Sequence, residues 1–497
     1  MRIVRSSVLA VFVCVACTRA STAPSPVRLE RAPLQRTIDS LLSLPETRQA
    51  RWGVLVVDPE AGDTIYSRDA GKLFVPASNM KIITSAVALA VLGSDFRYAT
   101  PILGSGPVRT GVLDGDLLVV GRGDPTVSDN AAGDAMLPLR VLADSLWAHG
   151  LRRVRGRVLA SGNAFPDANA GAGWSWDDLD ESYGALTDEL LFNEGFSVVQ
   201  VTGAAQAGAP PSVRTRPAAT FPRVRVEART VERRGADTVA HLTLVKDTVR
   251  GDVVVGGTVP VGDSASLEVT HADPDAAFIA ALREALAYRG VVVNDSAVTA
   301  GTTTDTLATL RSPPLSAILR DFLKPSQNQI GEMLFKTIAL QRGDTGSERI
   351  ARRVITDQLR LWGVRDDGVV VADGSGLSRM DLVSPETIVR VLDAMRRAPT
   401  FGVYRDALPL AGFDGTLASR MRGTRADANV RGKTGTLTGV RSLSGYITTL
   451  DGRLLIFSML CNNYTVPTAF ITRVQDAIAA RLASLRLQAP PGAGGRD

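Results

Sequence analysis

The strongest constraint on how this chain folds is the distance along the sequence between three short polar motifs. They are Ser78-Asn79-Met80-Lys81, Ser326-Gln327-Asn328 and Lys433-Thr434-Gly435. Each triplet alone would occur by chance in a chain of 497 residues, but their order and surroundings together indicate one active site. The 248 residues between Ser78 and Ser326 far exceed any loop of a compact domain. The sequence therefore predicts a discontinuous catalytic domain that carries a folded insertion.

The first motif places a nucleophile beside a base. A serine hydroxyl is a weak nucleophile until a base lies within hydrogen-bonding reach. Residues three apart share one face of a helix, so Lys81 can reach the oxygen of Ser78. The apolar run over residues 82–92, with Pro76 before it and Gly93 after it, predicts a buried helix whose first turn opens into a cleft. The alternative is that Ser78 only caps the helix and Lys81 is solvated.

The third motif predicts a strand beside a substrate. Residues 431–439 are rich in Thr and Gly and lead through a turn into a second predicted strand at residues 442–447. Glycine in such a strand allows another backbone to approach closely. Lys433 would offer a cation to a substrate carboxylate, with the Thr434 hydroxyl beside it. The alternative is a plain surface hairpin.

The middle motif has a competitor in Ser128-Asp129-Asn130. Residues 189–193, Glu-Leu-Leu-Phe-Asn, also resemble the Glu-x-x-Leu-Asn motif that supplies the deacylating base of class A β-lactamases. The surroundings favour Ser326 and Asn328, because they lead into a largely apolar helix, whereas Ser128 lies in a Gly/Pro-rich loop. A β-lactamase would also leave the long middle region without a role.

Taken together, the motifs resemble those of the D-alanyl-D-alanine carboxypeptidase/endopeptidases, the low-molecular-mass class C penicillin-binding proteins. The resemblance covers nearly the whole mature chain, and residues 121–126, 174–178, 373–378 and 408–416 look like further family signatures in the expected order. One departure is Arg122, where the family usually carries glycine. The resemblance implies an α+β fold: a penicillin-binding/β-lactamase-like transpeptidase domain, with helices on an antiparallel sheet, interrupted by a large β-rich insertion.

The resemblance also implies a serine-type mechanism that needs no cofactor. Lys81 would take the proton of Ser78, which attacks the penultimate D-alanine carbonyl of a peptidoglycan stem peptide; β-lactams would be covalent inhibitors. The backbone N–H groups of Ser78 and Thr436 would form the oxyanion hole. Ser326, held by Lys81 and Lys433, would pass a proton to the leaving amine, and Asn328 would bind the substrate amide. The implied catalytic residues are Ser78, Lys81, Ser326, Asn328 and Lys433, and the substrate-binding residues are Thr434, Gly435 and Thr436.

The organisation along the chain follows from the motifs. Residues 28–95 and 300–487 would form the catalytic domain, beginning with a helix at 34–42 and a strand at 52–58. Residues 96–299 would form the insertion, as one or two subdomains, and the Pro- and Gly-rich tail 488–497 would be disordered. Strands are predicted within the insertion at residues 154–160, 197–202, 224–228, 240–245 and 252–259.

The first 17 residues predict a targeting segment. Arg2 and Arg5 precede an apolar run at residues 8–16 that is too short to span a bilayer. Val15-Ala16-Cys17 resembles the end of a bacterial lipobox, with Cys14 where leucine is usual, so lipidation of Cys17 and simple release are alternatives. Either outcome predicts a location in the periplasm or elsewhere in the extracytoplasmic envelope.

The remaining composition excludes several classes of function. The net charge of +5, about +3 without Arg2 and Arg5, is too weak and scattered for a nucleic-acid surface. The expectation for Cys461 is a buried, inert thiol. The three histidines, His149, His241 and His271, have no metal-ligand spacing and are expected at the surface, so no metal site is predicted.

Two alternatives to a carboxypeptidase stay open at the level of sequence. One is the β-lactamase described above, which would hydrolyse penicillins quickly. The other is an envelope protein that binds peptidoglycan without turnover, with the insertion as its docking surface. Intact motifs argue against the second, because an inactive protein would be free to lose Lys81 or Lys433.

Overall fold

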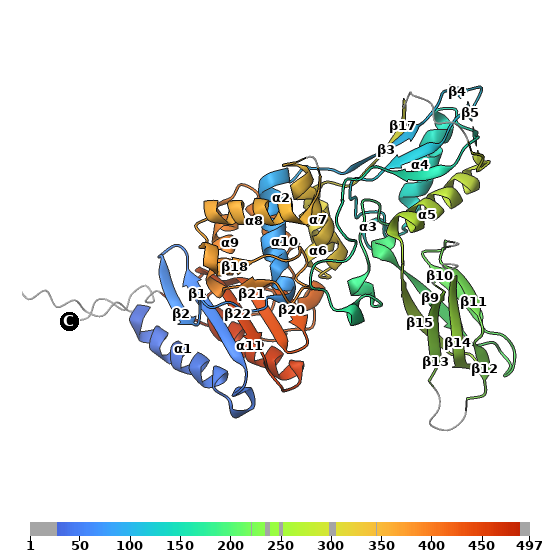
Figure 1. Cartoon of the computed structure of the whole chain (residues 1–497). Coiled ribbons are helices and arrows are strands. Elements are labelled where there is room, and N and C mark those ends of the chain that lie inside the picture. Colours follow the sequence, from blue (N-terminus) through green and yellow to red (C-terminus); the bar gives the residue numbers. More distant parts are fainter. Residues whose placement is uncertain are drawn as a thin grey trace, which may run out of the picture.

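The computed structural model describes residues 27–219, 221–233, 239–247, 252–297, 305–343 and 345–487. These residues form a catalytic lobe, built from both ends of the chain, and an inserted lobe built from its middle (Figure 1). The predicted α+β class is confirmed. The predicted targeting segment with Cys14 and Cys17, and the predicted disordered tail, lie outside the described residues.

A five-stranded antiparallel sheet forms the centre of the catalytic lobe. In its strand order, β2-β1-β22-β21-β20, two strands from the start of the chain join three from its end through the pairing of β1 with β22, which explains why the lobe is discontinuous. Helices cover both faces of the sheet (Figure 1), so β1 is buried on both sides and its sequence is a continuous apolar run. The strands are β1 (Arg51–Asp58), β2 (Asp63–Arg68), β20 (Arg431–Leu437), β21 (Val440–Thr448) and β22 (Leu454–Asn462).

Two hydrophobic cores flank this sheet. One lies between the sheet and the terminal helices α1 (Val27–Leu42) and α11 (Thr468–Ala483). The other holds the nucleophile helix α2 (Met80–Leu92) among the remaining helices, and a two-stranded ribbon, β18 (Val369–Val370) with β19 (Leu382–Val383), lies beside it. The remaining helices are α6 (Leu315–Leu323), α7 (Asn328–Leu340), α8 (Glu348–Leu361), α9 (Pro385–Arg397) and α10 (Phe401–Ala407).

The nucleophile helix forms as its sequence predicts. A 3-10 turn, Ala77–Asn79, precedes α2, and Gly93 ends the helix with a φ of 81° that favours glycine. Ten residues of α2 are buried, because other helices surround it. Ser78 therefore lies in the turn that leads into the helix, with Lys81 in the first helical turn.

The inserted lobe consists of two units. In the first, two small sheets pack with α4 (Met136–Ala148) and α5 (Pro274–Arg289) around one core. The strands of these sheets are β3 (Ala99–Gly104), β4 (Val108–Arg109), β5 (Val112–Leu113), β6 (Leu117–Val120), β7 (Arg153–Val154), β8 (Val158–Ser161), β16 (Val292–Val293) and β17 (Asp305–Arg311). A short helix, α3 (Asp129–Ala132), follows β6.

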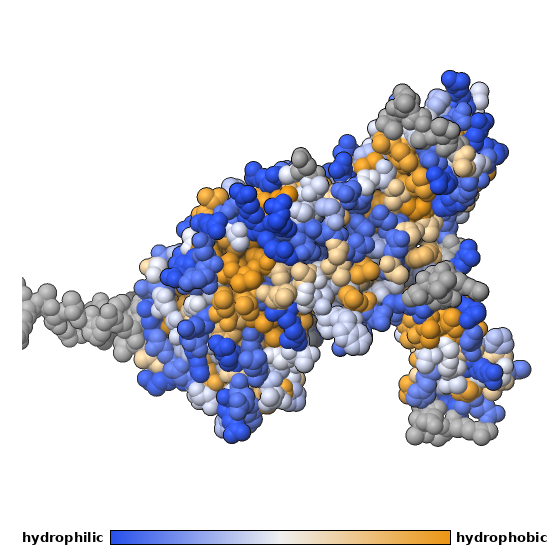
Figure 2. Space-filling model, viewed as in Figure 1, coloured by the Kyte–Doolittle hydropathy of each residue, from blue (hydrophilic) through white to orange (hydrophobic). Residues whose placement is uncertain are grey.

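The second unit is a β-sandwich that projects away from the rest of the molecule (Figures 1 and 2). One sheet has the order β10-β9-β15; the other has the order β11-β14-β12, with β13 also pairing with β14. A small core rich in valine fills the space between the sheets. The strands are β9 (Phe196–Thr202), β10 (Ser212–Arg216), β11 (Arg223–Val226), β12 (Arg229–Val231), β13 (His241–Asp247), β14 (Asp252–Pro260) and β15 (Ser264–Thr270).

The inserted lobe differs from the sequence prediction in three ways. It contains the helices α4 and α5 as well as strands. The predicted strand at residues 154–160 is two short strands, β7 and β8, which pair into different sheets. The lobe also extends beyond residue 299, because β17 returns to pair with β3. Among the described residues, no helix is both long and apolar enough to cross a membrane.

Candidate active site

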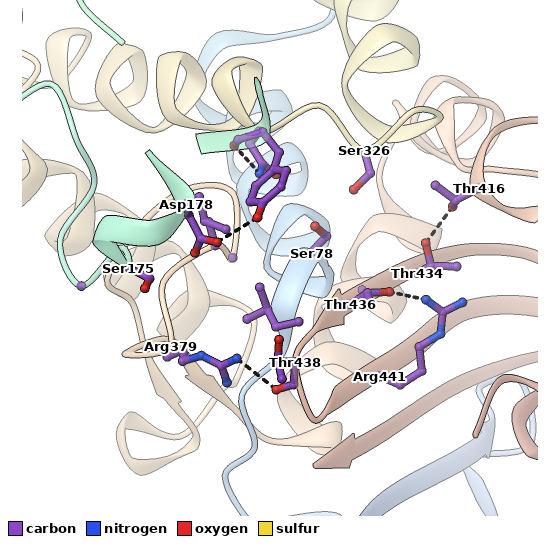
Figure 3. A pocket seen from close by; sticks show the side chains of 17 residues that line it. Ser78, Ser175, Asp178, Ser326, Arg379, Thr416, Thr434, Thr436, Thr438 and Arg441 are labelled. Atoms are coloured by element: carbon purple, nitrogen blue, oxygen red, sulfur yellow. Dashed lines mark hydrogen bonds between the residues drawn. The ribbon is translucent and has the colours of Figure 1, made fainter. Parts of the chain in front are cut away.

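All three motifs line one cleft of about 540 Å³ in the catalytic lobe (Figure 3). The turn before α2 supplies Ser78, the segment between α6 and α7 supplies Ser326, the first residue of α7 is Asn328, and β20 supplies Thr434 to Thr436. Other parts of the chain complete the wall. The remaining lining residues are Gly173, Ser175, Asp178, Tyr183, Gly376, Leu377, Arg379, Thr416, Leu437, Thr438 and Arg441.

Two glycines allow the backbone to close around Ser78. A Cβ atom at Gly435 would lie 2.2 Å from Ser442 Oγ and 2.9 Å from Ser78 N, so only glycine lets β20 approach the turn this closely. Gly376 lies on the loop between β18 and β19, and a Cβ atom there would lie 2.0 Å from the carbonyl oxygen of Ala77. Ser78 is consequently held between a strand and a loop, with its side chain facing the cleft (Figure 3).

Lys81 contacts Ser78 and is removed from solvent. Its Nζ donates hydrogen bonds to Ser78 Oγ at 2.9 Å, to Asn328 Oδ1 at 2.6 Å and to the Ser375 carbonyl at 2.7 Å. Burial lowers the pKa of Lys81 to about 7, although the nearby charge of Asp373 acts in the opposite direction. A substantial fraction of this lysine is therefore neutral near pH 7, as a general base must be.

Ser326 is bound by the second lysine of the site. Lys433 Nζ donates to Ser326 Oγ at 2.8 Å and to the Thr434 carbonyl at 2.9 Å. Lys433 is completely buried, and burial together with the charge of Lys81 lowers its pKa well below the usual range. The sequence predicts that both lysines hold Ser326, but among the described residues only Lys433 makes that hydrogen bond.

Asn328 joins the catalytic lobe to the inserted lobe. Its Oδ1 accepts from Lys81, and its Nδ2 donates to the Tyr183 carbonyl at 2.8 Å. The next residue, Gln329, donates to the carbonyls of Ser182 and Ala185. Each polar atom of the Asn328 amide therefore has one protein partner, and one N–H donor and one acceptor site stay available for the predicted contact with a substrate amide.

The hydroxyls of β20 lie along the other side of the cleft (Figure 3). Thr434 Oγ1 donates to Thr416 Oγ1 at 2.7 Å, and Thr436 Oγ1 accepts from the guanidinium of Arg441. These hydroxyls and this guanidinium suit an anionic group beside Ser78 and Ser326.

Sequence reasoning missed several residues that line the cleft. Asp178, which accepts from the Tyr183 hydroxyl at 2.9 Å, comes from the inserted lobe, while Arg379 donates to the Thr438 carbonyl at 3.0 Å. Together they offer a carboxylate and a guanidinium to a charged part of a ligand. The segments 174–178 and 408–416, which contain Asp178 and Thr416, already look like family signatures in the sequence, but without an assigned role; no sequence pattern marks Arg379 or Arg441.

Two buried carboxylates hold the loop that presents the Ser375 carbonyl to Lys81. Glu332 of α7 accepts from the backbone N–H groups of Gly374, at 3.2 Å, and Ser375, at 2.9 Å. Asp373 accepts from three backbone N–H groups of its own loop and from Trp174 Nε1 of the inserted lobe at 2.9 Å. The position of the third Lys81 partner therefore depends on both lobes.

The competing serine motif does not line this cleft. Ser128 caps the short helix α3 and accepts from the Ala131 N–H group, and Asn130 donates to Glu194. Glu189 accepts from the Phe165 N–H group in the inserted lobe. None of these residues lines the cleft that contains Ser78.

The other sequence expectations have mixed outcomes. Cys461 is buried, as predicted, whereas the expectation of a surface histidine is wrong for His271, which is 2% exposed and hydrogen-bonds to Ser197 at 3.0 Å. His149 and His241 are exposed. Within the described ranges, no cluster of histidine, cysteine and carboxylate side chains could hold a metal ion.

Known proteins resemble this chain along most of its length. Residues 34–485 match the D-Ala-D-Ala carboxypeptidase 3 (S13) family. The chain is 36% identical over 479 residues to the D-alanyl-D-alanine carboxypeptidase of Actinomadura sp. (strain R39), an alignment that covers 93% of this chain and 86% of that protein.

Among solved structures, the chain is similar to penicillin binding protein 4 (dacB) from Haemophilus influenzae. The TM-score is 0.75 at 24% identity, over 90% of this chain and 99% of the other. A structure of the same protein complexed with a β-lactam gives a TM-score of 0.72 at 22% identity and the same coverage. This similarity confirms the predicted penicillin-binding fold.

Proposed function

The chain belongs to the D-Ala-D-Ala carboxypeptidase 3 (S13) family, and from that premise we propose that Ser78 is its nucleophile. The protein is a serine-type D-Ala-D-Ala carboxypeptidase that acts through an acyl-enzyme. The assignment of Ser78 as nucleophile and Lys81 as its base rests on the hydrogen bond between them, in a cleft lined by all three motifs. The substrate is a peptidoglycan stem peptide that ends in D-Ala-D-Ala.

When Lys81 is neutral, its two N–H groups donate to Asn328 Oδ1 and the Ser375 carbonyl, and its lone pair accepts from the Ser78 hydroxyl. In the proposed reaction, neutral Lys81 takes the Ser78 proton as Ser78 Oγ bonds to the penultimate D-alanine carbonyl carbon. The backbone N–H groups of Ser78 and Thr436 stabilise the oxyanion; the contact distances at Gly435 support this, because they bring β20 against the Ser78 turn. The C–N bond then breaks, and the proton that Lys81 took passes through Ser326, which Lys433 holds, to the leaving amine, which returns Lys81 to its neutral form. Water cleaves the resulting ester and regenerates Ser78.

β-Lactams are proposed to acylate the same serine. The related penicillin binding protein 4 forms a complex with a β-lactam, and the Ser78 side chain of this chain faces an open cleft. We expect the acyl-enzyme formed with a penicillin to persist, which distinguishes this protein from a β-lactamase. The location of Ser128 and Glu189 outside the cleft also disfavours the β-lactamase alternative.

The experiment measures intact protein mass after incubation with benzylpenicillin, alongside release of D-alanine from a stem pentapeptide. We expect one penicilloyl adduct per chain, lost together with D-alanine release in Ser78→Ala. Ser128→Ala is the matched control and should keep both. Normal D-alanine release by Ser78→Ala would refute the assignment. Rapid loss of the drug without an adduct would favour a β-lactamase, and neither adduct nor drug loss would favour a binding protein.

We also propose that the protein works in the extracytoplasmic envelope, where its substrate lies. The basic and apolar character of residues 2–16 and the Val15-Ala16-Cys17 sequence support export and lipid attachment at Cys17. Cell fractionation and the mass of the mature N-terminal peptide test this. A Cys17→Ala variant that stays with the membrane fraction would refute lipid anchoring through this residue.

A further inference from the structure

The two segments that imitate a β-lactamase meet at one junction in the inserted lobe. They are residues 128–130, Ser-Asp-Asn, and residues 189–193, which end in Asn193. The Asn193 N–H group donates to the Val127 carbonyl at 2.8 Å, and Asn193 Oδ1 accepts from the Asp129 N–H group at 3.0 Å. Hydrogen bonds therefore join the two segments, although neither of them lines the active cleft.

Glu194, the residue after Asn193, is a carboxylate buried at this junction. It is 4% exposed, and both of its oxygens accept from Asn130 Nδ2 at 2.9 Å. Burial raises the pKa of Glu194, whereas hydrogen bonds from the side chains of Asn130, Gln327 and Ser128 lower it. Gln327 is the middle residue of the second catalytic motif, so a carboxylate of the inserted lobe contacts that motif directly.

Gln327 fixes the backbone between Ser326 and α7. Its Oε1 accepts from the Ile330 N–H group at 2.9 Å and so caps the helix. Its side-chain amide has two N–H groups. One donates to Gln329 Oε1 at 2.7 Å, which leaves the other for Glu194. Both N–H groups are then engaged, and the orientation of the amide depends on Glu194.

Ser326 has a backbone conformation that its surroundings must enforce. Its φ is 70°, in the left-handed region that residues other than glycine seldom adopt. A serine persists there only when neighbouring contacts fix it. Lys433 holds the Ser326 hydroxyl at 2.8 Å, and Gln327 fixes the backbone that follows. Glu194 is thus the point at which the inserted lobe supports this conformation.

We infer that Glu194 is a positioning residue of the active site: through Gln327 it keeps Ser326 in the conformation that delivers a proton to the leaving amine. This inference rests on the proposed function, in which Ser326 passes that proton. Ser128 and Asn130 hold the Glu194 carboxylate, so the segments that imitate a β-lactamase act on the reaction from outside the cleft. The step that depends on Glu194 is cleavage of the C–N bond, because an amine leaves poorly until it is protonated.

The experiment compares two leaving groups. The substrates are a stem pentapeptide ending in D-Ala-D-Ala and the same peptide with a thioester in place of its terminal amide bond. Both form the same acyl-enzyme, so the ratio of their kcat/KM values reports acylation alone. A thiolate leaves without a proton, so cleavage of the thioester does not need Ser326 as an acid.

Ser326→Ala should lower kcat/KM for the peptide, relative to the thioester, by about 100-fold or more, because it removes the proton donor. Glu194→Ala should lower the same ratio by about 10-fold, because Ser326 is present but less well placed. Glu194→Gln keeps one oxygen acceptor and should lower it less. Asn130→Ala, which removes the donor to both Glu194 oxygens, should lower it as well.

Glu189→Ala is the matched control, because it removes a buried carboxylate of the neighbouring segment that binds the Phe165 N–H group instead of Gln327. It can slow both substrates, but we expect the ratio to remain. Equal losses on both substrates in Glu194→Ala, beside a selective loss in Ser326→Ala, would overturn the inference while leaving the proposed function intact. If Glu194→Ala did not fold, an unchanged ratio in Glu194→Gln and Asn130→Ala would overturn it as well.

Two other outcomes concern the proposed function itself. Equal losses on both substrates in Ser326→Ala would refute the role given to Ser326, and this inference with it. A wild-type protein that cleaved neither substrate would refute the carboxypeptidase function.

Discussion

Lys81 is arranged to act as a base in a site that has no histidine among its lining residues. Its three hydrogen bonds use every direction of the amine, so its position relative to Ser78 is fixed. Burial lowers the pKa, whereas the charges of Asp373, Glu332 and Asp381 raise it, and the result is a value of about 7. The buried acids therefore limit how far the pKa falls.

We predict that acylation of Ser78 slows as the pH falls below about 7. Protonated Lys81 cannot accept the Ser78 proton, so the second-order rate constant for acylation should fall by about tenfold per pH unit below the pKa and level off above it. The rate of benzylpenicillin adduct formation, measured by intact mass across this range, gives the profile. A rate that stayed constant well below neutral pH would show that Lys81 is not the base.

Among the individual residues of the site, the sequence predicts only those contacts that form within one helical turn. The contact between Ser78 and Lys81 follows from their spacing alone. The partner of Ser326 does not, because it depends on how β20 lies against the segment before α7. Arg441 was missed for the same reason: its place beside Thr436 comes from the register of two strands.

At the scale of elements, the loop between β18 and β19 controls the third partner of Lys81. Residues 373–378 wrap around the carboxylates of Glu332 and Asp373, which together accept most of the backbone N–H groups of the loop. Buried N–H groups seldom lack a partner, so the loop has few other stable conformations. The carboxylates of Glu332 and Asp373 therefore hold the Ser375 carbonyl in a fixed position.

We predict that Glu332→Ala weakens both stability and acylation. It leaves the N–H groups of Gly374 and Ser375 unsatisfied, at a cost of about 1–3 kcal/mol for each. The Ser375 carbonyl then loses its fixed position next to Lys81, so adduct formation with benzylpenicillin should slow. Urea denaturation and the acylation rate measure the two effects. Glu332→Gln keeps one oxygen acceptor and should lose less of each; equal losses in both variants would contradict the role given to the accepted hydrogen bonds.

His271 makes the inserted lobe sensitive to acid. It follows β15, bonds to Ser197 of β9 and packs between Phe192 and Phe221, and burial lowers its pKa to about 3. An unfolded histidine has a pKa near 6.5, so between about pH 6.5 and pH 3 the unfolded chain binds one more proton than the folded chain. This contribution to stability is complete above pH 6.5 and declines as the pH falls.

We predict that the free energy of unfolding falls with pH in that window by up to about 1.4 kcal/mol per pH unit through His271. Urea denaturation of the wild type and His271→Gln at several pH values measures the slope, which should be shallower in the variant. His149→Gln is the control, because His149 is exposed and should leave the slope unchanged. Identical slopes in the wild type and His271→Gln would argue against this account.

The sequence predicts elements best where one pattern continues over a full element. The apolar run of α2 and the alternating patterns of β9, β13 and β14 coincide with predicted segments. The run at residues 154–160 fails, because Arg155 and Gly156 lie between β7 and β8, which join different sheets. The pattern of apolar residues in one segment does not predict which sheet that segment joins.

At the scale of the whole molecule, the inserted lobe is part of the active site. Its residues 173–183 supply Ser175, Asp178 and Tyr183 to the cleft, and its backbone carbonyls accept from Asn328 and Gln329 of α7. A purely peripheral docking module would leave the cleft complete without it. No sequence pattern predicts these contacts, because they join residues about 150 to 200 positions apart.

The contact of Trp174 with Asp373 is where the inserted lobe reaches the loop that positions Lys81. Trp174→Phe keeps an aromatic ring but removes the N–H group that donates to Asp373 Oδ2, so that oxygen loses its partner from the inserted lobe and keeps the Ser378 N–H group of its own loop. Loss of a hydrogen bond worth about 0.5–1.5 kcal/mol predicts a decrease of about 2- to 13-fold in the rate of acylation by benzylpenicillin. Trp176→Phe is the matched control, because Trp176 lies two residues away, is 82% exposed and does not line the cleft. If both variants acylated at the wild-type rate while Glu332→Ala was slow, the catalytic lobe would position Lys81 unaided, and the inserted lobe would act only through substrate binding.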